Sequence, residues 1–304
     1  MPVRLLWALF IAAALAVFIT YWRLPPDDLY NVSERGFPLG AGRLLVFLNY
    51  PVSLAAIAIA WLAAERISGR WSLCAAGAAT VLCAVTAWPG VVDQNDLDAK
   101  AVNVVPALGV AIAFALSLRA PWERIGRLPL DPVRVVVGVV VWLFAAVWVA
   151  AVLGFYFPGD LLLGEELRRG RDRLLHPAVH LGEHEGLDAA LLVTSALVLT
   201  RYRPRLAVLT LLGLAFVYGL AVEWGDFWFE QVVKRGWTSW RPPAVLTPRV
   251  SAAWLALLVL AVLVATVVRR LEGPARPAGD PRRTAPSPPL DRPSAESTRG
   301  APSP

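Results

Sequence analysis

The chain has 304 residues, of which 57% are hydrophobic and only 17% are charged, and its mean hydropathy is +0.56. A soluble domain carries about 25% charged residues, so this composition excludes an ordinary soluble globular protein. The net charge of +6 would suit nucleic-acid binding in a soluble protein, but most arginines lie in loops and the tail. Membrane topology and anionic lipid headgroups account for them there, so no nucleic-acid partner is expected.

Long apolar runs follow one another along the chain, and about 18 apolar residues are enough to cross a bilayer as a helix. They predict an all-α, polytopic integral membrane protein with about eight transmembrane helices in one bundle, since the alternation typical of β-barrel strands is absent. The predicted spans are residues 5–22, 44–64, 72–88, 101–118, 135–157, 186–200, 206–222 and 252–268. The first run is expected to be an uncleaved helix, because Tyr21-Trp22-Arg23 is typical of an interfacial anchor.

Arginine placement predicts the orientation of these spans. The connections after the second, fourth and sixth spans are rich in arginine, and arginine in short loops favours the cytoplasmic side. Both termini are therefore expected in the cytoplasm of a cell membrane, with residues 158–185 and 223–250 on the outer side. Residues 1–270 form the predicted transmembrane domain. Residues 271–304 are rich in proline and poor in apolar side chains, and predict a disordered cytoplasmic tail.

The third span contains both cysteines within a stretch of small residues. Cys74 and Cys83 lie nine residues apart, about 13 Å along a helix, which is too far for a disulfide. The sequence CAAGAAT between them predicts a face on which another helix approaches closely.

All three histidines lie in one short stretch, HPAVHLGEHEG, before the sixth span. Short tracts rich in histidine are a compositional sign of metal binding. A helix that runs from Pro177 to Thr200 would place a polar residue at every fourth position on one face: His176, His180, His184 and Asp188. Gly182 and Gly186 weaken such a helix, and the alternative is a helix that begins only at Gly186. Because carboxylates inside a membrane usually face the bundle interior, Asp188 is a candidate catalytic or proton-handling residue.

Acidic residues at the end of the seventh span match these histidines in height. Glu223, Asp226 and Glu230 are spaced three and four residues apart, and the five-residue turn RYRPR makes the sixth and seventh spans antiparallel neighbours. Counted from that turn, His184 and Glu223 lie at about 24 and 26 Å, and His180 and Asp226 both lie at about 30 Å. The four side chains therefore predict a site for a divalent metal ion such as Zn²⁺, Mn²⁺ or iron.

The five residues HLGEH, from His180 to His184, resemble the H-x-x-E-H motif of the inverzincin metalloproteases. By this resemblance His180 and His184 would hold zinc and Glu183 would activate a water molecule, with Glu223 or Glu230 as the third protein ligand.

The histidines and acids have a structural alternative to a metal site, which is that they form the polar end of a membrane helix. Helices that leave a bilayer normally turn polar, and four tryptophans in residues 224–240 are typical of the aromatic belt at that boundary. Just before the histidines stands a cationic run that could bind a phosphate or a lipid headgroup, made of Arg168, Arg169, Arg171 and Arg173. The alternative is that these arginines pair with the acids around them, Glu165, Glu166 and Asp172.

Three classes of function remain open from the sequence. The first is an outer-face site that acts on or binds a lipid or another ligand with a headgroup. The second is a proton-coupled transporter with Asp188 and the histidines as a relay, and the third is an accessory or scaffold subunit without catalysis. Membrane lipids are the expected partners, and other membrane subunits are candidates.

Overall fold

The computed structural model describes residues 2–23, 39–88, 90–91, 99–123, 125–152, 165–169, 173–178, 185–233, 235–245 and 250–273. Arg171, His180, Glu183 and His184 lie outside the described residues, and so does the predicted tail from residue 274 onward. For residues 165–169 and 173–178 the backbone is described and the side chains are not.

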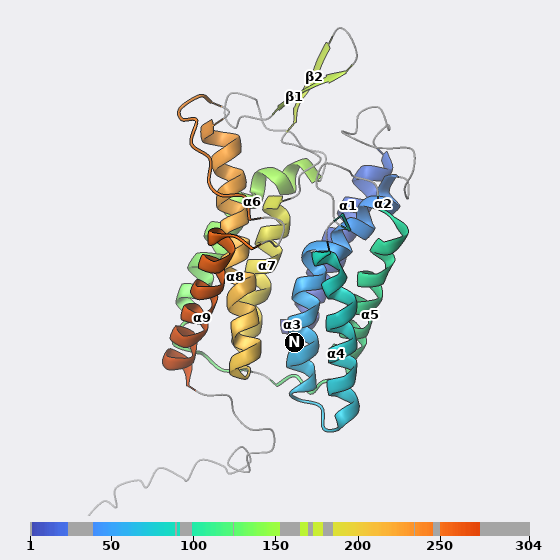
Figure 1. Ribbon diagram of the computed structural model, residues 1–304, viewed down its shortest axis with the longest axis vertical. Coiled ribbons are helices and arrows are strands. Elements are labelled where there is room, and N and C mark those ends of the chain that lie inside the picture. Colours follow the sequence, from blue (N-terminus) through green and yellow to red (C-terminus); the bar gives the residue numbers. More distant parts are fainter. Residues whose placement is uncertain are drawn as a thin grey trace, which may run out of the picture.

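A helix lies at each of the eight predicted spans, which confirms the predicted membrane bundle (Figure 1). The α-helices are α1 (Pro2–Arg23), α2 (Leu39–Phe47), α3 (Ser53–Ala64), α4 (Arg70–Ala84), α5 (Val104–Arg119), α6 (Asp131–Val152), α7 (Glu185–Thr200), α8 (Leu206–Trp228) and α9 (Ala252–Glu272). Four short 3-10 or π turns join or extend these helices, at Leu48–Val52, Val85–Ala87, Ala101–Asn103 and Phe229–Val233. Among the described residues, six helical segments are long and apolar enough to cross a membrane.

The second span is interrupted between α2 and α3, where Pro51 has no amide hydrogen to give and Tyr50 is extended. Two buried asparagines supply hydrogen bonds at this point. The side-chain nitrogen Nδ2 of Asn49 donates to the backbone carbonyl oxygens of Leu45 and Asn103, both at 2.7 Å. The amide nitrogen of Asn103 donates to Asn49 Oδ1 at 2.9 Å, so the interruption is fastened to the start of α5.

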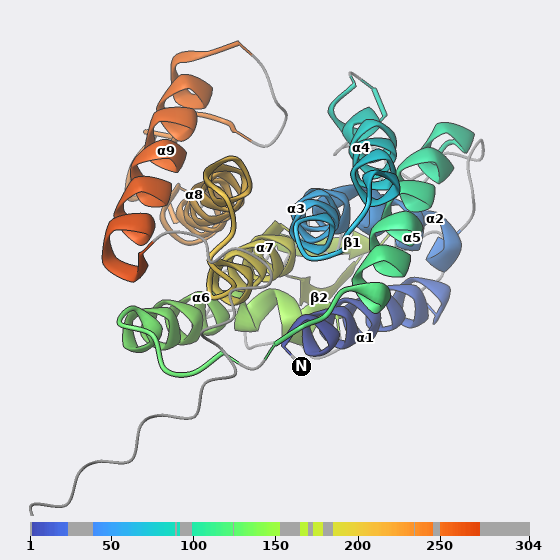
Figure 2. The ribbon, with the colours of Figure 1, turned by 90° about the horizontal axis from the view of Figure 1, so that it is seen from below.

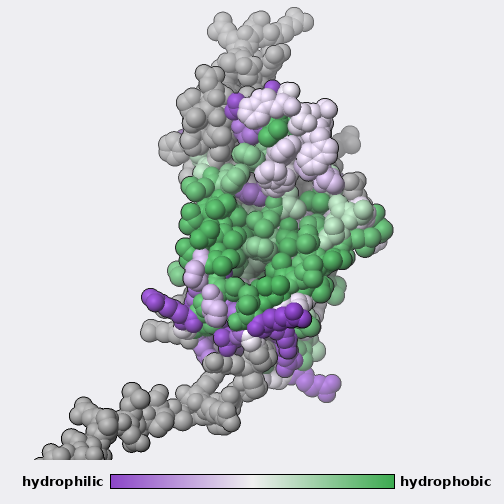
Figure 3. All heavy atoms as spheres, turned by 90° about the vertical axis from the view of Figure 1, so that its left-hand side faces the viewer, coloured by the Kyte–Doolittle hydropathy of each residue, from purple (hydrophilic) through white to green (hydrophobic). Residues whose placement is uncertain are grey.

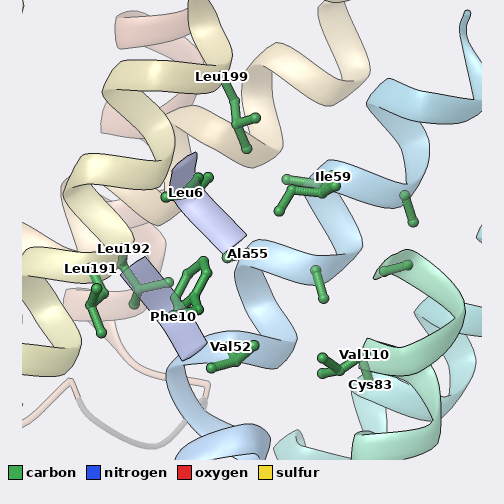
Figure 4. Packing of buried hydrophobic residues seen from close by; sticks show 14 of the residues in the cluster. Leu6, Phe10, Val52, Ala55, Ile59, Cys83, Val110, Leu191, Leu192 and Leu199 are labelled. Atoms are coloured by element: carbon green, nitrogen blue, oxygen red, sulfur yellow. The ribbon is translucent and has the colours of Figure 1, made fainter. Parts of the chain in front are cut away.

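The helices form two groups that meet at α7, as the view along the bundle shows (Figure 2). Helices α1 to α5 make up one group and α6 to α9 the other, with α7 packed against α8 and also against α1 and α3. The core between the groups is aliphatic: Leu6 and Phe10 of α1 and Ile59 of α3 lie near Leu191 and Leu192 of α7 (Figure 4).

Small residues allow the closest helix contacts. In α4 the buried face consists of Ser72, Ala76, Ala79 and Cys83, and α5 presents Gly109 to it. A Cβ atom at Gly109 would lie 2.6 Å from Cys83 Sγ and 2.9 Å from the Ala79 carbonyl oxygen. This packing confirms the small-residue face predicted for the span. Both cysteines are free, as predicted from their spacing. Cys83 is buried in this contact, whereas Cys74 is exposed.

On the face drawn in Figure 3, a belt of apolar side chains lies between two polar ends of the bundle. At one end, called here the Arg-rich end, lie Arg66, Arg70, Arg201 and Arg205 in the turns between helices. At the other, the Trp-rich end, lie the exposed rings of Trp22, Trp88, Trp224 and Trp240. Trp7 Nε1 donates to Ser117 Oγ at 2.9 Å, so α1 begins where α5 ends, at the Arg-rich end.

A buried ion-pair network joins three helices at the Arg-rich end. Arg134 of α6 donates to both carboxylate oxygens of Glu272 in α9, at 2.6 and 2.8 Å, and to Thr200 Oγ1 of α7 at 3.2 Å. Asp131 is 3.2 Å from Arg134 and 3.0 Å from Arg201. The end of α9 therefore lies at the same end of the bundle as the start of α1.

The expected helix from Pro177 to Thr200 is wrong in its first part. Residues Arg173–Ala178 form strand β2, which pairs antiparallel with β1 (Glu165–Arg169), and α7 begins only at Glu185. His176 lies opposite Leu167 in this hairpin, so it does not share a helical face with Asp188. The physical reason is that pairing with β1 holds residues 173–178 extended, while Gly182 disfavours a continuous helix from there by about 1 kcal/mol relative to alanine.

Candidate functional site

Helices α7 and α8 are antiparallel neighbours joined by residues 201–205, as predicted. Their close contact is at Gly219, where an added Cβ atom would lie 2.8 Å from Val193 Cγ2 and 3.0 Å from the Ala189 carbonyl oxygen. Only glycine leaves room for α7 at this height. The contact therefore fixes the register of α8 against α7.

This register brings the acids of the two helices to similar heights above the Gly219 contact. Glu223 is four residues beyond Gly219, or about 6 Å along α8. Asp188 lies about 5 Å above the mean height of the α7 residues that face Gly219, and Asp226 lies about 10 Å above it on α8. Three acids of consecutive helices thus occupy the last turns before the Trp-rich end.

All three acids face the interior of the bundle. Their exposed fractions are 8% for Asp188, 5% for Glu223 and 6% for Asp226. Neither carboxylate oxygen of Glu223 accepts a hydrogen bond from any residue that the structure describes. A buried carboxylate is unfavourable by several kcal/mol unless a proton, a cation or a hydrogen-bond donor compensates it.

Trp224, beside Glu223 on the same helix, faces the other way. Trp224 is 48% exposed, and its ring lies 5.3 Å from that of Trp228. Trp228 Nε1 donates to the Trp240 carbonyl oxygen at 3.1 Å, which ties the segment after α8 to the helix. These rings fit the predicted aromatic belt. Acids that merely capped the helix towards water would lie on this exposed side, whereas Glu223 and Asp226 lie on the buried one.

The predicted cationic run falls on the β-hairpin next to the Trp-rich end. Arg168 and Arg169 lie in β1 and Arg173 in β2, and Arg169 is opposite Arg173 in the register. Arg171, between the strands, is outside the described residues. The backbone thus brings three of the four arginines of this run together in one hairpin.

The remaining predicted ligands, His180 and His184, and the predicted base Glu183 lie outside the described residues. Within the described part of the chain, no group of three or more His, Cys, Asp or Glu side chains is arranged to hold a metal ion. The acids of α7 and α8 do not make a metal site alone, so the metal hypothesis depends on the two histidines.

Asn49 and Asn103 are two buried polar residues inside the helix bundle, and their side chains bond to one another. Each is 1% exposed, and their side-chain amides are joined by a hydrogen bond. Asn103 Nδ2 also donates to the Val91 carbonyl oxygen at 2.7 Å. The geometry thus assigns them to fastening the helix interruption.

The ion pair of Arg134 and Glu272 was missed by sequence reasoning. The two residues are 138 positions apart, and no local spacing connects them. The available signal was their common predicted side of the membrane.

The chain matches no protein-family model, no curated protein and no solved structure. Its function is therefore inferred from the geometry of its own side chains.

Proposed function

We propose that this chain is a multi-pass protein of the cell membrane, with both termini in the cytoplasm, that binds a divalent metal ion between α7 and α8 at the outer boundary. The proposed ligands are His180, His184, Glu223 and Asp226. The observation that carries the proposal is the inward burial of the acids, above all of Glu223, whose oxygens accept no hydrogen bond from the described residues.

The choice of a metal ion follows from the donor set. Two imidazole nitrogens with one or two carboxylates suit Zn²⁺, Mn²⁺ or non-haem iron. The register of α7 and α8 supports this set, because α7 begins one residue after His184 in the sequence, at the end of the helix pair where Glu223 and Asp226 are buried. In this proposal Asp188 and Glu183 are the groups available to move protons beside the ion.

The molecule that we propose to bind beside the metal ion is a lipid or another molecule with an anionic headgroup. The hairpin arginines 168, 169 and 173 lie on the same end of the bundle as the acids, and arginine binds phosphate through two parallel hydrogen bonds. A headgroup held there would be presented to the ion from the membrane boundary.

The decisive experiment is metal analysis of the purified full-length protein after exposure to Zn²⁺, Mn²⁺ or Fe²⁺ and removal of unbound ion. One ion per chain is expected. The variants His180→Ala, His184→Ala and Glu223→Gln should each bind it about tenfold more weakly or worse, by the size of comparable losses at metal sites.

His176→Ala is the matched control, because His176 lies in the β-hairpin and belongs to no proposed ligand set. It should retain the ion with unchanged affinity. Absence of stoichiometric metal from the wild-type protein would overturn the proposal and favour an accessory subunit. Proton-driven uptake into liposomes that is lost in Asp188→Asn would favour a transporter instead.

A further inference from the structure

A cavity of about 650 Å³ lies at the Arg-rich end, where the turn from α3 to α4 meets the start of α8. One wall is apolar and continues into the hydrophobic belt, with Trp61, Leu73 and Leu211 as its largest side chains. Trp61 is held in place because its Nε1 donates to Thr80 Oγ1 of α4 at 2.8 Å. The lining also carries three polar groups, Glu65 after α3, Arg70 at the start of α4 and Arg205 before α8.

The two arginines of the cavity are available to a ligand. The guanidinium groups of Arg70 and Arg205 make no hydrogen bond or ion pair with any residue that the structure describes. The neighbouring Arg66 is different, since it donates to the carbonyl oxygens of Leu62 at 2.7 Å and Tyr202 at 2.9 Å. Its guanidinium also stacks on the Tyr202 ring, so it serves the structure.

The single acid of the cavity is already used. Both carboxylate oxygens of Glu65 accept the backbone N–H of Arg205 at 3.2 Å, at the start of α8. Burial raises the pKa of Glu65, and this hydrogen bond and the charges of Arg66 and Arg205 partly offset the rise. The helix starts of α4 and α8 add partial positive charge, and neither has a side-chain cap.

We propose that this cavity binds one phospholipid with an anionic headgroup. Its phosphate would lie between Arg70 and Arg205, and an acyl chain would follow the wall of Trp61, Leu73 and Leu211 into the apolar belt. A soluble phosphate compound would satisfy the arginines but would leave the apolar wall against water. The site lies at the opposite end of the bundle from the acids of α7 and α8, and the proposal does not depend on the metal site.

Native mass spectrometry of the purified full-length protein tests the proposal with phosphatidylglycerol and phosphatidylcholine of identical acyl chains. One phosphatidylglycerol should bind tightly. The double variant Arg70→Gln/Arg205→Gln should lose about 30-fold in affinity, from about 1 kcal/mol for each arginine near a lipid headgroup. Leu73→Gln, at a position that is 48% exposed, should weaken binding without loss of folding.

The matched control is Arg119→Gln/Arg127→Gln, which removes two exposed arginines at the same end of the bundle outside the cavity. It should keep the wild-type affinity. Equal loss in both double variants would overturn the proposal, and so would equal binding of phosphatidylcholine or of soluble glycerol phosphate. If the cavity variant does not fold, the affinity of the wild-type protein for phosphatidylglycerol is measured at increasing salt concentration. An affinity that does not fall as the salt concentration rises would overturn the proposal.

Discussion

Replacing Glu272 by alanine removes one partner of the ion pair that links the end of α9 to the start of α6. Among the described residues of α9, only Glu272 forms an ion pair with Arg134. Most of the other side chains of α9 lie at the apolar surface of the bundle. The side chains of Arg134 and Glu272 are 9% and 1% exposed. In the Glu272→Ala variant Arg134 therefore keeps its charge in a buried position without its closest counter-ion.

The loss of one partner of a buried ion pair lowers the free energy of unfolding by about 3–5 kcal/mol. We expect the free energy of unfolding to fall by about 3 kcal/mol, the lower end of this range. The reason is that Asp131 and Thr200 still contact Arg134, each at 3.2 Å. In a chain of this size, each kcal/mol lowers the midpoint temperature of thermal unfolding by about 2 °C, so this temperature should fall by about 6 °C.

The assay is thermal unfolding in detergent, followed by a dye that reacts with thiols. Cys74→Ala removes the exposed cysteine, so the buried Cys83 reports unfolding. A fall of less than about 2 °C for Glu272→Ala would refute the reasoning. The double variant Arg134→Met/Glu272→Leu should stay within about 1 kcal/mol of the parent, since no uncompensated charge remains. A double variant as unstable as Glu272→Ala would show that packing, and not charge, is lost.

Three further predictions follow from single contacts. Gly219→Leu should lower the free energy of unfolding by about 1–3 kcal/mol by forcing α7 and α8 apart, whereas Gly77→Ala, which meets no atom within 4 Å, should be neutral or stabilising in the same thermal assay. Burial raises the pKa of Asp131, but the hydrogen bond from the Leu128 backbone N–H and the contact with Arg201 together hold this pKa below its usual value. Its contribution to stability is complete above the unfolded value near pH 4 and is lost as pH falls through the lower folded value, so Asp131→Asn should flatten the acid side of a stability-against-pH curve. A small thiol reagent should label Cys74 in the folded protein and Cys83 only after unfolding, as mass spectrometry of the labelled peptides would show.

The hairpin of β1 and β2 marks where sequence reasoning failed. The four-residue spacing of the histidines is compatible with a helix, but spacing states only which face residues would share if a helix formed. The structure instead places His176 and Pro177 in an extended strand. Pairing with β1 decided this, and such pairing is not visible in a periodicity count.

The eight helical spans and their order follow from the sequence by itself. A long apolar run in lipid satisfies its backbone hydrogen bonds within its own helix and needs no partner to do so. The sequence also determined that Glu223 and Asp226 share a face of α8. Only the tertiary structure decided that this face is the buried one, because the direction of a helical face depends on where a neighbour comes close, and here that place is Gly219 against α7. The same holds for Arg134 and Glu272, whose charges meet because packing brings together helices that lie far apart in the chain.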